Sequence, residues 1–192
     1  GFTLNSENQL VDADGNRVRF TLITNAGNKI REAMGAQIKQ NLADIGIQVD
    51  FQPIAFGALV DRLTDSLDWE AHIIGFTGGV EPHGGANVWR PDGELHAFNQ
   101  GALAGQDPIE GRKVDDWEQE IWDLFVQGSQ EIDETQRQAT YAQAQMLVQE
   151  NLPFIYLINS YSLAAIRNRV EGVQPTAVGG PIWNLYELEI SE

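Results

Sequence analysis

Residues 17–51 read R-V-R-F-T-L-I-T-N-A-G-N-K-I-R-E-A-M-G-A-Q-I-K-Q-N-L-A-D-I-G-I-Q-V-D-F, and this stretch decides the fold class. Apolar and polar side chains alternate over 17–24, which predicts a β-strand. From 29 to 45, apolar side chains recur at spacings of three and four, which predicts a helix with one apolar stripe that ends at Gly46. Residues 47–51 alternate again. A strand, a crossover helix and a second strand predict a parallel pair in an α/β domain.

The remaining sequence continues this α/β pattern. Residues 1–16 are rich in turn formers and predict a loop or weak hairpin. The stripe of the first helix comprises Ile30, Met34, Ile38, Leu42 and Ile45. The other predicted elements are a short helix over 56–66 with Leu59, Leu63 and Phe56 inward, a buried strand over 69–76, helices over 114–128 and 134–150, strands over 154–159 and 161–167, and extended structure over 182–190. Asp133 is expected to cap the helix 134–150, with Gln136 completing a capping box.

Composition excludes several classes of protein. The chain has 192 residues, a formal net charge of −16 and no cysteine. The negative charge argues against binding to nucleic acid or to an anionic membrane surface, since both require basic patches. Without cysteine there are no disulfides, zinc ribbons or thiol nucleophiles. The chain begins at Gly1 rather than Met, so we expect a processed chain or a piece of a longer one.

Half of the negative charge lies in one region. Residues 107–134 hold ten acidic and two basic residues. On the predicted helix 114–128 the acids lie off the apolar stripe that includes Trp117, Ile121 and Leu124. We therefore interpret them as a solvated helix face.

Three histidines allow a metal site to be considered. The segments E-P-H at 81–83 and E-L-H at 94–96 offer oxygen and nitrogen ligands, but neither has the spacing of a helical metal motif. A hydrolase that uses Glu81 with a second carboxylate, or a metal at His83 and His96, is therefore an alternative without a specific signal. His72 lies inside a predicted strand, where a packed or half-exposed histidine is expected.

The most informative stretch is I-I-G-F-T-G-G-V-E-P-H-G-G-A-N-V-W-R at 73–90. It opens an irregular segment, 77–113, whose apolar and aromatic residues indicate an ordered loop. In α/β sheets, ligands bind beyond the carboxyl ends of the strands, and glycines let the backbone approach them closely. The side chains that this loop offers for a ligand are those of Glu81, His83, Asn87 and Trp89. The alternative is a surface loop in which Trp89 only fills the core.

Six segments in the same order resemble the C-terminal lobe of the family 5 extracellular solute-binding proteins, the oligopeptide- and dipeptide-binding components of ABC importers. They are T-L-I-T-N-A-G-N-K-I-R-E-A, N-L-A-D-I-G-I-Q-V-D-F, G-F-T-G-G-V-E-P, N-V-W, R-Q-A-T-Y-A-Q-A-Q-M-L-V-Q-E-N-L-P-F-I-Y-L and L-A-A-I-R-N-R-V-E-G-V. The resemblance covers the chain from about Val18 to Ile190.

The resemblance implies an α/β fold, namely one lobe of a type II periplasmic-binding-protein-like fold with a central mixed sheet flanked by helices. Residues 1–192 would form a single C-terminal ligand-binding lobe whose first lobe is absent, with 77–113 as a long cleft loop and 185–190 as a strand that belongs with the missing lobe. The function implied is capture of a ligand for an ABC transporter, without covalent chemistry or a cofactor. We expect a peptide or another small solute as ligand, a membrane permease as partner, no nucleic acid, and a monomer when full length. The expected location is periplasmic or extracellular, with or without a lipid anchor.

The site residues follow the same resemblance. Peptide-binding members of the family hold the ligand's N-terminal amine with an aspartate in the loop after this strand, and the matching residue here is Glu81. The part of the loop that lines the cleft matches Asn87 and Trp89, with His83 between them and Glu81. The backbone of Thr77, Gly78 and Gly79 is expected to pair with an extended ligand. The longer loop at 90–113 leaves open a binder of sugars or of a metal chelate.

Overall fold

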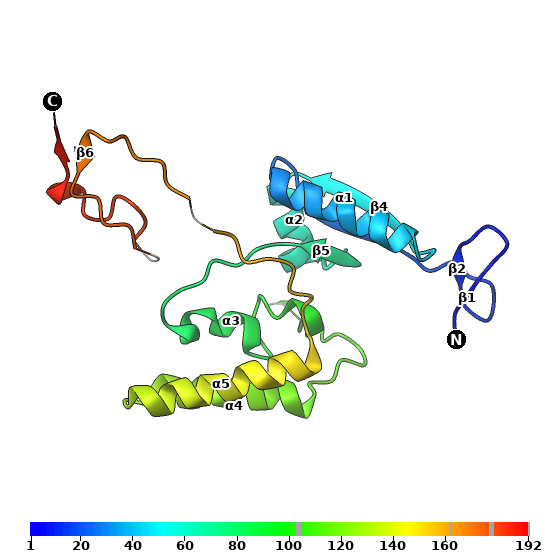
Figure 1. Ribbon diagram of the computed structural model, residues 1–192. Coiled ribbons are helices and arrows are strands. Elements are labelled where there is room, and N and C mark those ends of the chain that lie inside the picture. Colours follow the sequence, from blue (N-terminus) through cyan, green and yellow to red (C-terminus); the bar gives the residue numbers. More distant parts are fainter. Residues whose placement is uncertain (103–104, 162, 177–178, 192) are drawn as a thin grey trace. The chain divides into compact units, whose positions relative to one another are not determined.

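The computed structural model describes residues 1–102, 105–161, 163–176 and 179–191. These residues form two compact units, the first built from 1–77 and 92–112 and the second from 78–91 and 113–192. Figure 1 shows the elements of both. Residues 103–104 of the predicted loop 77–113 and residue 162 of the predicted strand 161–167 lie outside the described residues. The single-lobe organisation over 1–192 stays a prediction.

The first unit contains a parallel sheet. Its strands are β3 (Arg19–Asn25), β4 (Gln48–Ile54) and β5 (Ala71–Ile73), in the order β4-β3-β5, and both pairings are parallel. The helix α1 (Lys29–Ala43) connects β3 to β4. The predicted strand–helix–strand unit is therefore confirmed, and so is the α/β fold class. The antiparallel pairs in this chain form separate two-stranded sheets.

The helix α1 packs on one face of this sheet. Its N-cap, Asn28, accepts a hydrogen bond from the Arg31 amide. Met34, Ile38 and Leu42 pack against the buried side chains of the strands, as predicted, in a core that comprises Leu22, Val49 and Ile73. Ile30 and Ile45 are more than half exposed, so the predicted stripe is wrong at both ends. Ile30 lies in the first turn and Ile45 follows the last one, where helical spacing no longer directs a side chain towards the sheet.

Gly46 ends the turn after α1 with a φ of +84°. A Cβ atom at this position would lie 2.6 Å from the Leu10 backbone nitrogen. Both the left-handed backbone and the lack of space require glycine here, which confirms its predicted place after the helix.

The next elements are α2 (Phe56–Asp61) and a π-helical turn over Arg62–Ser66. Leu59 is fully buried, as predicted, but Phe56 is exposed because it is the first residue of α2. The predicted strand 69–76 is reduced to β5, since pairing with β3 ends at Ile73. The Thr24 hydroxyl, fully buried, donates to the Ile73 carbonyl at 2.9 Å and ties the ends of β3 and β5 together.

The second unit is built around a helical pair. The helices α4 (Asp116–Gln130) and α5 (Glu134–Asn151) lie side by side (Figure 1). Their core comprises Ile121, Phe125, Tyr141 and Ala144. Gly128 of α4 allows the close approach, because a Cβ atom there would lie 2.7 Å from the Tyr141 ring. The apolar face predicted for 114–128 is confirmed.

Two N-caps define where these helices begin. Asp133 accepts a hydrogen bond from the Gln136 amide at 2.9 Å, which confirms the predicted cap of α5. A reciprocal capping box forms at the other helix, between Asp115 and Glu118. Glu118 is therefore buried, 2% exposed, and is the exception to the solvated acidic face predicted for 107–134.

The short elements of the irregular segment lie in both units. In the second unit a 3-10 helix over Pro82–Gly85 leads into α3 (Ala86–Trp89). In the first unit another 3-10 helix spans Ala97–Asn99. The described part of 77–113 is thus an ordered segment without strands, and it buries Val88 and His96.

The two ends of the chain carry short antiparallel pairs. The strands β1 (Thr3–Leu4) and β2 (Leu10–Val11) form the predicted weak hairpin, and β6 (Val170–Glu171) pairs with β7 (Glu189–Ile190). The predicted extension over 182–190 is wrong before β7, because Leu185–Glu187 is a 3-10 turn.

The predicted strands 154–159 and 161–167 are also wrong in the described residues. Figure 1 shows this stretch as coil between α5 and β6. A strand forms only by pairing, and within the described part of the chain no partner strand pairs with it.

Candidate functional site

The carboxyl ends of β3, β4 and β5 lie at one edge of the parallel sheet, where α/β proteins bind ligands. Asn25 ends β3 and accepts a hydrogen bond from Arg31 Nη1 at 2.6 Å. Thr77 follows β5, is exposed and ends the first of the two stretches, 1–77 and 92–112, that make up the first unit. The sequence interpretation missed Asn25 and Arg31, although a polar turn directly after a predicted strand was a signal for them.

Gly78 and Gly79 begin the second unit and are both exposed. A Cβ atom at Gly78 would meet nothing within 4 Å, and at Gly79 only the Glu81 carbonyl oxygen at 3.9 Å. Neither glycine has a positive φ. The local fold therefore does not itself require glycine at these positions, and their backbone is open to an approaching molecule.

Glu81 immediately precedes the 3-10 helix Pro82–Gly85. Its Oε2 lies 3.9 Å from Nε of Arg137 on α5, and the two side chains are 54% and 34% exposed. A well-formed pair of this kind has about 2.7–2.9 Å between nitrogen and oxygen, so this contact is loose. Arg137 also points a guanidinium nitrogen at the Glu131 carbonyl, at 3.4 Å. The carboxylate therefore keeps free acceptor capacity beside a cation.

The Tyr141 hydroxyl is buried and lies beside the Glu81 carboxylate, without a hydrogen bond of normal geometry. Burial raises the pKa of this phenol above its ordinary value, and the negative charge of Glu81 raises it further. Arg137 acts in the opposite direction. Glu81, Arg137 and Tyr141 form a polar cluster on the surface of the second unit, which we call the Glu81 cluster.

His83 is an anchor for the loop rather than a free imidazole. Its Nδ1 lies 3.2 Å from the Phe125 carbonyl oxygen of α4. A carbonyl can only accept, so Nδ1 carries the hydrogen in this contact and donates it. The ring also lies 6.3 Å from the ring of Trp122. These contacts fix the 3-10 turn against α4.

Asn87 and Trp89 both lie on α3. Asn87 is half-buried. The Trp89 indole lies 6.2 Å from the Phe125 ring and 5.9 Å from the Phe154 ring, edge to face with the latter. It packs against the core of the second unit. Of the two interpretations of Trp89, the structure supports the one in which it fills the core.

The metal alternative gains no support from geometry. Over residues 1–102, 105–161, 163–176 and 179–191, no group of three or more histidine, aspartate or glutamate side chains is placed to hold an ion. His96 is fully buried against Phe98, with ring centres 4.1 Å apart. His72 contacts Trp69 edge to face at 4.5 Å, and burial lowers the pKa of His72. It is half-buried, as expected.

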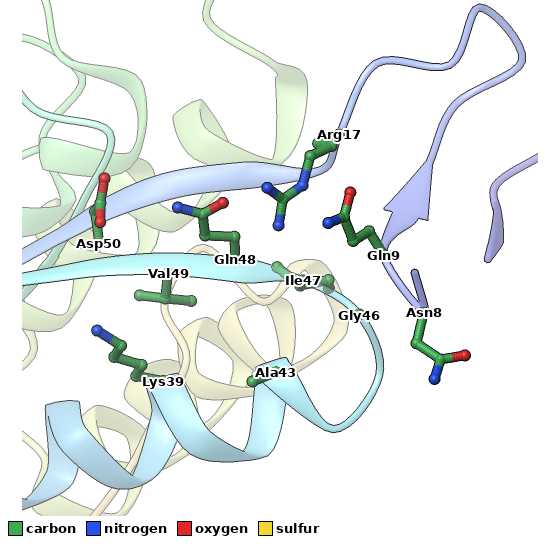
Figure 2. Close-up of a pocket in the computed structure, with 10 residues that line it drawn as sticks. All are labelled: Asn8, Gln9, Arg17, Lys39, Ala43, Gly46, Ile47, Gln48, Val49 and Asp50. Carbon is green, nitrogen blue, oxygen red and sulfur yellow. The ribbon is translucent and has the colours of Figure 1, made fainter. Parts of the chain in front are cut away.

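Two cavities lie in the first unit, and neither contains a predicted site residue. One has a volume of about 300 Å³ and lies at the amino ends of the strands. Figure 2 shows Lys39 and Ala43 reaching it from α1, and Gln48, Val49 and Asp50 from β4. The other, of about 100 Å³, is lined mainly by apolar side chains after and beneath β5, together with His72. Besides His72, the lining consists of the apolar residues Val60, Leu63, Ile74, Phe76, Leu95 and Ala97 and the polar residues Thr64 and Glu94.

Comparison with known proteins identifies relatives. No family model matches the chain. It is 35% identical over 186 residues, 90% of its length, to a probable ABC transporter-binding protein of Deinococcus radiodurans, of which it covers 30%. Over 69 residues, 35% of the chain and 13% of the relative, it is 36% identical to the oligopeptide-binding protein AppA of Bacillus subtilis.

The fold agrees with these relatives. The structure of Bacillus subtilis AppA in complex with a nonapeptide matches with a TM-score of 0.70 and 22% identity, over 100% of this chain and 35% of that one. The periplasmic binding protein MelB of Agrobacterium fabrum C58, in complex with stachyose, matches with a TM-score of 0.62 and 15% identity, over 80% of this chain and 23% of that one. These homologues are solute-binding proteins and not enzymes, which argues against the hydrolase alternative.

The chain spans about a third of the length of these relatives, 30% of the Deinococcus protein and 35% of AppA. In the described residues, no helix is both long enough and apolar enough to cross a membrane. The resemblance seen in the sequence is thus confirmed by sequence identity over nearly the whole chain and by the fold. The chain corresponds to part of a family 5 extracellular solute-binding protein and covers about a third of such a protein.

Proposed function

We propose that this chain is a ligand-capturing part of an extracytoplasmic solute-binding protein that delivers peptides or similar small solutes to an ABC permease. The rest of the protein, including the lobe that this chain lacks, supplies the other wall of the site. The family assignment and the names of the relatives support this proposal. Binding then depends on closure of two lobes around a desolvated ligand, with no covalent chemistry.

The observation that carries the proposal for a peptide is the state of Glu81. Its carboxylate is half exposed, makes a loose contact with Arg137 and lies beside the Tyr141 hydroxyl. An ammonium group at about 2.7–2.9 Å forms a much stronger charge-assisted hydrogen bond. Glu81 is thus poised to hold the N-terminal amine of a peptide. The Arg137 guanidinium lies beside this carboxylate but does not close on it, since it is also directed at the Glu131 carbonyl.

Thr77, Gly78 and Gly79 are proposed to contact the ligand through their backbone. All three are exposed, and no side chain fills the space that a Cβ would take at Gly78. An extended peptide can pair with such a segment by strand addition. Gly78→Ala would leave the protein's own packing intact while obstructing that approach.

The sugar-binding alternative receives less support. Sugar sites commonly present an exposed aromatic face, whereas the candidate in this loop, Trp89, is partly buried and packs against the core of the second unit. His83 and Asn87 are both half-buried. We therefore favour a peptide ligand.

The experiment compares two nonapeptides of the same sequence, one with a free N-terminus and one N-acetylated, on the full-length protein that contains this chain. Glu81→Gln is expected to weaken the binding of the free-amine peptide by roughly 10- to 100-fold, which is the contribution of a hydrogen bond to a charged group. The affinity for the acetylated peptide is expected to stay unchanged. Glu120→Gln, at an exposed carboxylate on α4, is the matched control. An equal loss of affinity for both peptides, or no loss of affinity for either, would contradict the role of Glu81 in holding the amine.

A further inference from the structure

The smaller cavity of the first unit, of about 100 Å³, is a pocket with mainly apolar walls. The walls come from α2 with the turn after it, from the end of β5 and from residues 94–97, all within the same compact unit. Phe76 and Leu95 line the cavity and are 50% and 36% exposed, so it reaches the surface at these side chains. A small molecule or a side chain can therefore enter it. We call it the His72 pocket, after the histidine in its wall.

His72 contributes a polar atom that lacks a partner. Its Nδ1 is buried and makes no hydrogen bond within the described part of the chain. Burial lowers the pKa of this imidazole, so the ring is neutral at pH 7 and one of its nitrogens is an acceptor. Native proteins leave few buried polar atoms unsatisfied, because each one costs the free energy of a missing hydrogen bond. A molecule bound in the His72 pocket can supply that bond.

We propose that the His72 pocket binds a phenol ring, as the side chain of a tyrosine in the captured peptide presents it. The ring lies among the apolar walls, and its hydroxyl donates a hydrogen bond to Nδ1 of His72, which then carries its own hydrogen on Nε2. Phe76 offers an aromatic ring for an offset or edge-to-face contact with the phenol.

Size and polarity favour a phenol over other groups. An apolar cavity of about 150 Å³ holds a whole benzene molecule, so a pocket of about 100 Å³ that opens to the surface holds most of one such ring and is too small for an indole. A leucine or phenylalanine side chain would leave Nδ1 of His72 without its hydrogen bond. Glu94 also lines the pocket, and its carboxylate disfavours an anionic group there.

The position of the His72 pocket connects it to the proposed ligand path. His72 lies in β5, and Ile74 and Phe76 follow it towards the carboxyl end of the sheet. The next residue, Thr77, is one of those whose backbone is proposed to pair with an extended ligand. The inference rests on the proposed function for the source of the phenol, whereas the pocket itself can be tested with a phenol alone.

The first test compares p-cresol, the side chain of tyrosine, with toluene, the side chain of phenylalanine, on the full-length protein that contains this chain. Titration is followed by nuclear magnetic resonance of histidine labelled with nitrogen-15, because a hydrogen bond to Nδ1 of His72 shifts the resonance of that nitrogen. p-Cresol is expected to bind roughly 3- to 10-fold more tightly than toluene, which is the contribution of one hydrogen bond between neutral groups. His72→Phe keeps an aromatic ring and is expected to abolish this preference.

A second variant tests the place of binding. Ala97→Leu fills part of the His72 pocket and is expected to weaken both p-cresol and toluene by at least about 10-fold. Ala36→Leu, at an exposed position of α1, is the matched control and is expected to weaken neither. Thermal unfolding checks that each variant is folded. Equal affinities for p-cresol and toluene, or a preference that persists in His72→Phe, would overturn the inference.

Peptides separate this inference from the proposed function. In a series of nonapeptides that carry one tyrosine at successive positions, one member is expected to bind more tightly than its phenylalanine counterpart, and His72→Phe is expected to remove that gain. If p-cresol binds as described and no peptide binds, the phenol pocket stands and the proposed function fails. If peptides bind and no position prefers tyrosine, the inference fails and the proposed function stands.

Discussion

Replacement of Gly128 by alanine tests the packing on which the Glu81 cluster depends. The new Cβ would lie 2.7, 2.8 and 3.1 Å from three carbon atoms of the Tyr141 ring. Carbon atoms pack best at about 3.5–4.0 Å, so the ring must move by up to about 1 Å. Tyr141 is 5% exposed and is held by the Phe125 ring at 5.3 Å, so it has little room to move.

Two effects of opposite sign set the magnitude. Alanine stabilises a helix by about 0.5–1 kcal/mol relative to glycine. Overpacking of a close contact costs about 1–3 kcal/mol. The expected result for Gly128→Ala is a protein less stable by about 0.5–2 kcal/mol. Gly57→Ala is the matched control, because Gly57 is also helical but a Cβ there would meet nothing within 4 Å. That variant is expected to gain about 0.5 kcal/mol.

The assay is urea unfolding, monitored by far-ultraviolet circular dichroism. Both variants are compared with the wild type on the condition that the free energy of unfolding falls with urea concentration at the same slope in all three. Because Tyr141 lies beside Glu81, Gly128→Ala should also weaken ligand binding by the full-length protein. Adding Tyr141→Leu should remove most of the cost of Gly128→Ala, which a double-mutant cycle would show as coupling between the two sites. The reasoning is refuted if Gly128→Ala stabilises the chain as much as Gly57→Ala.

Two further predictions concern pH. The folded protein keeps Tyr141 protonated above its ordinary pKa of 10.0, so the free energy of unfolding should fall as the pH rises through and beyond about 10. The pKa of Tyr156 is also raised, so Tyr141→Phe should reduce this fall to the part that Tyr156 contributes. Urea unfolding at about pH 9 and pH 11 measures the difference. Burial lowers the pKa of His72 from 6.5, so the unfolded chain binds a proton before the folded chain does as the pH falls. The free energy of unfolding should therefore decrease from about pH 7.5 to 5.5. An equal decrease in His72→Phe would show that another group is responsible.

The elements that could be predicted are those whose pattern is local. The β3–α1–β4 unit follows from alternation, helical spacing and one turn glycine within residues 17–51. Each of these signals involves residues only a few positions apart in the sequence. The cap at Asp133 is equally local, since the side chain bonds an amide three residues on. Neither depends on the rest of the fold.

The failures occurred where the outcome depends on distant residues. The segments 154–159 and 161–167 have the pattern of strands, but a strand needs a partner, and local sequence cannot show whether one is present. Trp89 was predicted to line a cleft or to fill a core, and its contacts with the rings of Phe125 and Phe154, far away in sequence, favour the core, while its place in a cleft stays a prediction. Glu118 is a different case. Its capping box with Asp115 is local, and treating all the acids of 107–134 as one solvated face overlooked it.

The residues of the candidate site divide in the same way, into one with a local sequence signal and others that are placed by packing between distant parts of the chain. Glu81 was a candidate because a carboxylate in a glycine-rich loop after a strand is a local signal; the structure shows it half exposed, and its role as a ligand contact stays a prediction. Its neighbours Arg137 and Tyr141 lie more than 50 positions further along the chain, on α5, and only the packing of that helix brings them to the loop. The anchoring bond of His83 to α4 was equally invisible, because it depends on a backbone carbonyl 42 residues away.

The most direct test of the central claim is titration calorimetry of one free-amine nonapeptide into two proteins, the full-length protein and the 192-residue chain. This chain spans about a third of its relatives, and we propose that it supplies only part of the site. The account therefore predicts micromolar or tighter binding to the full-length protein and no measurable heat with the chain alone. Tight binding by the 192-residue chain alone, or absence of peptide binding by the full-length protein, would contradict it.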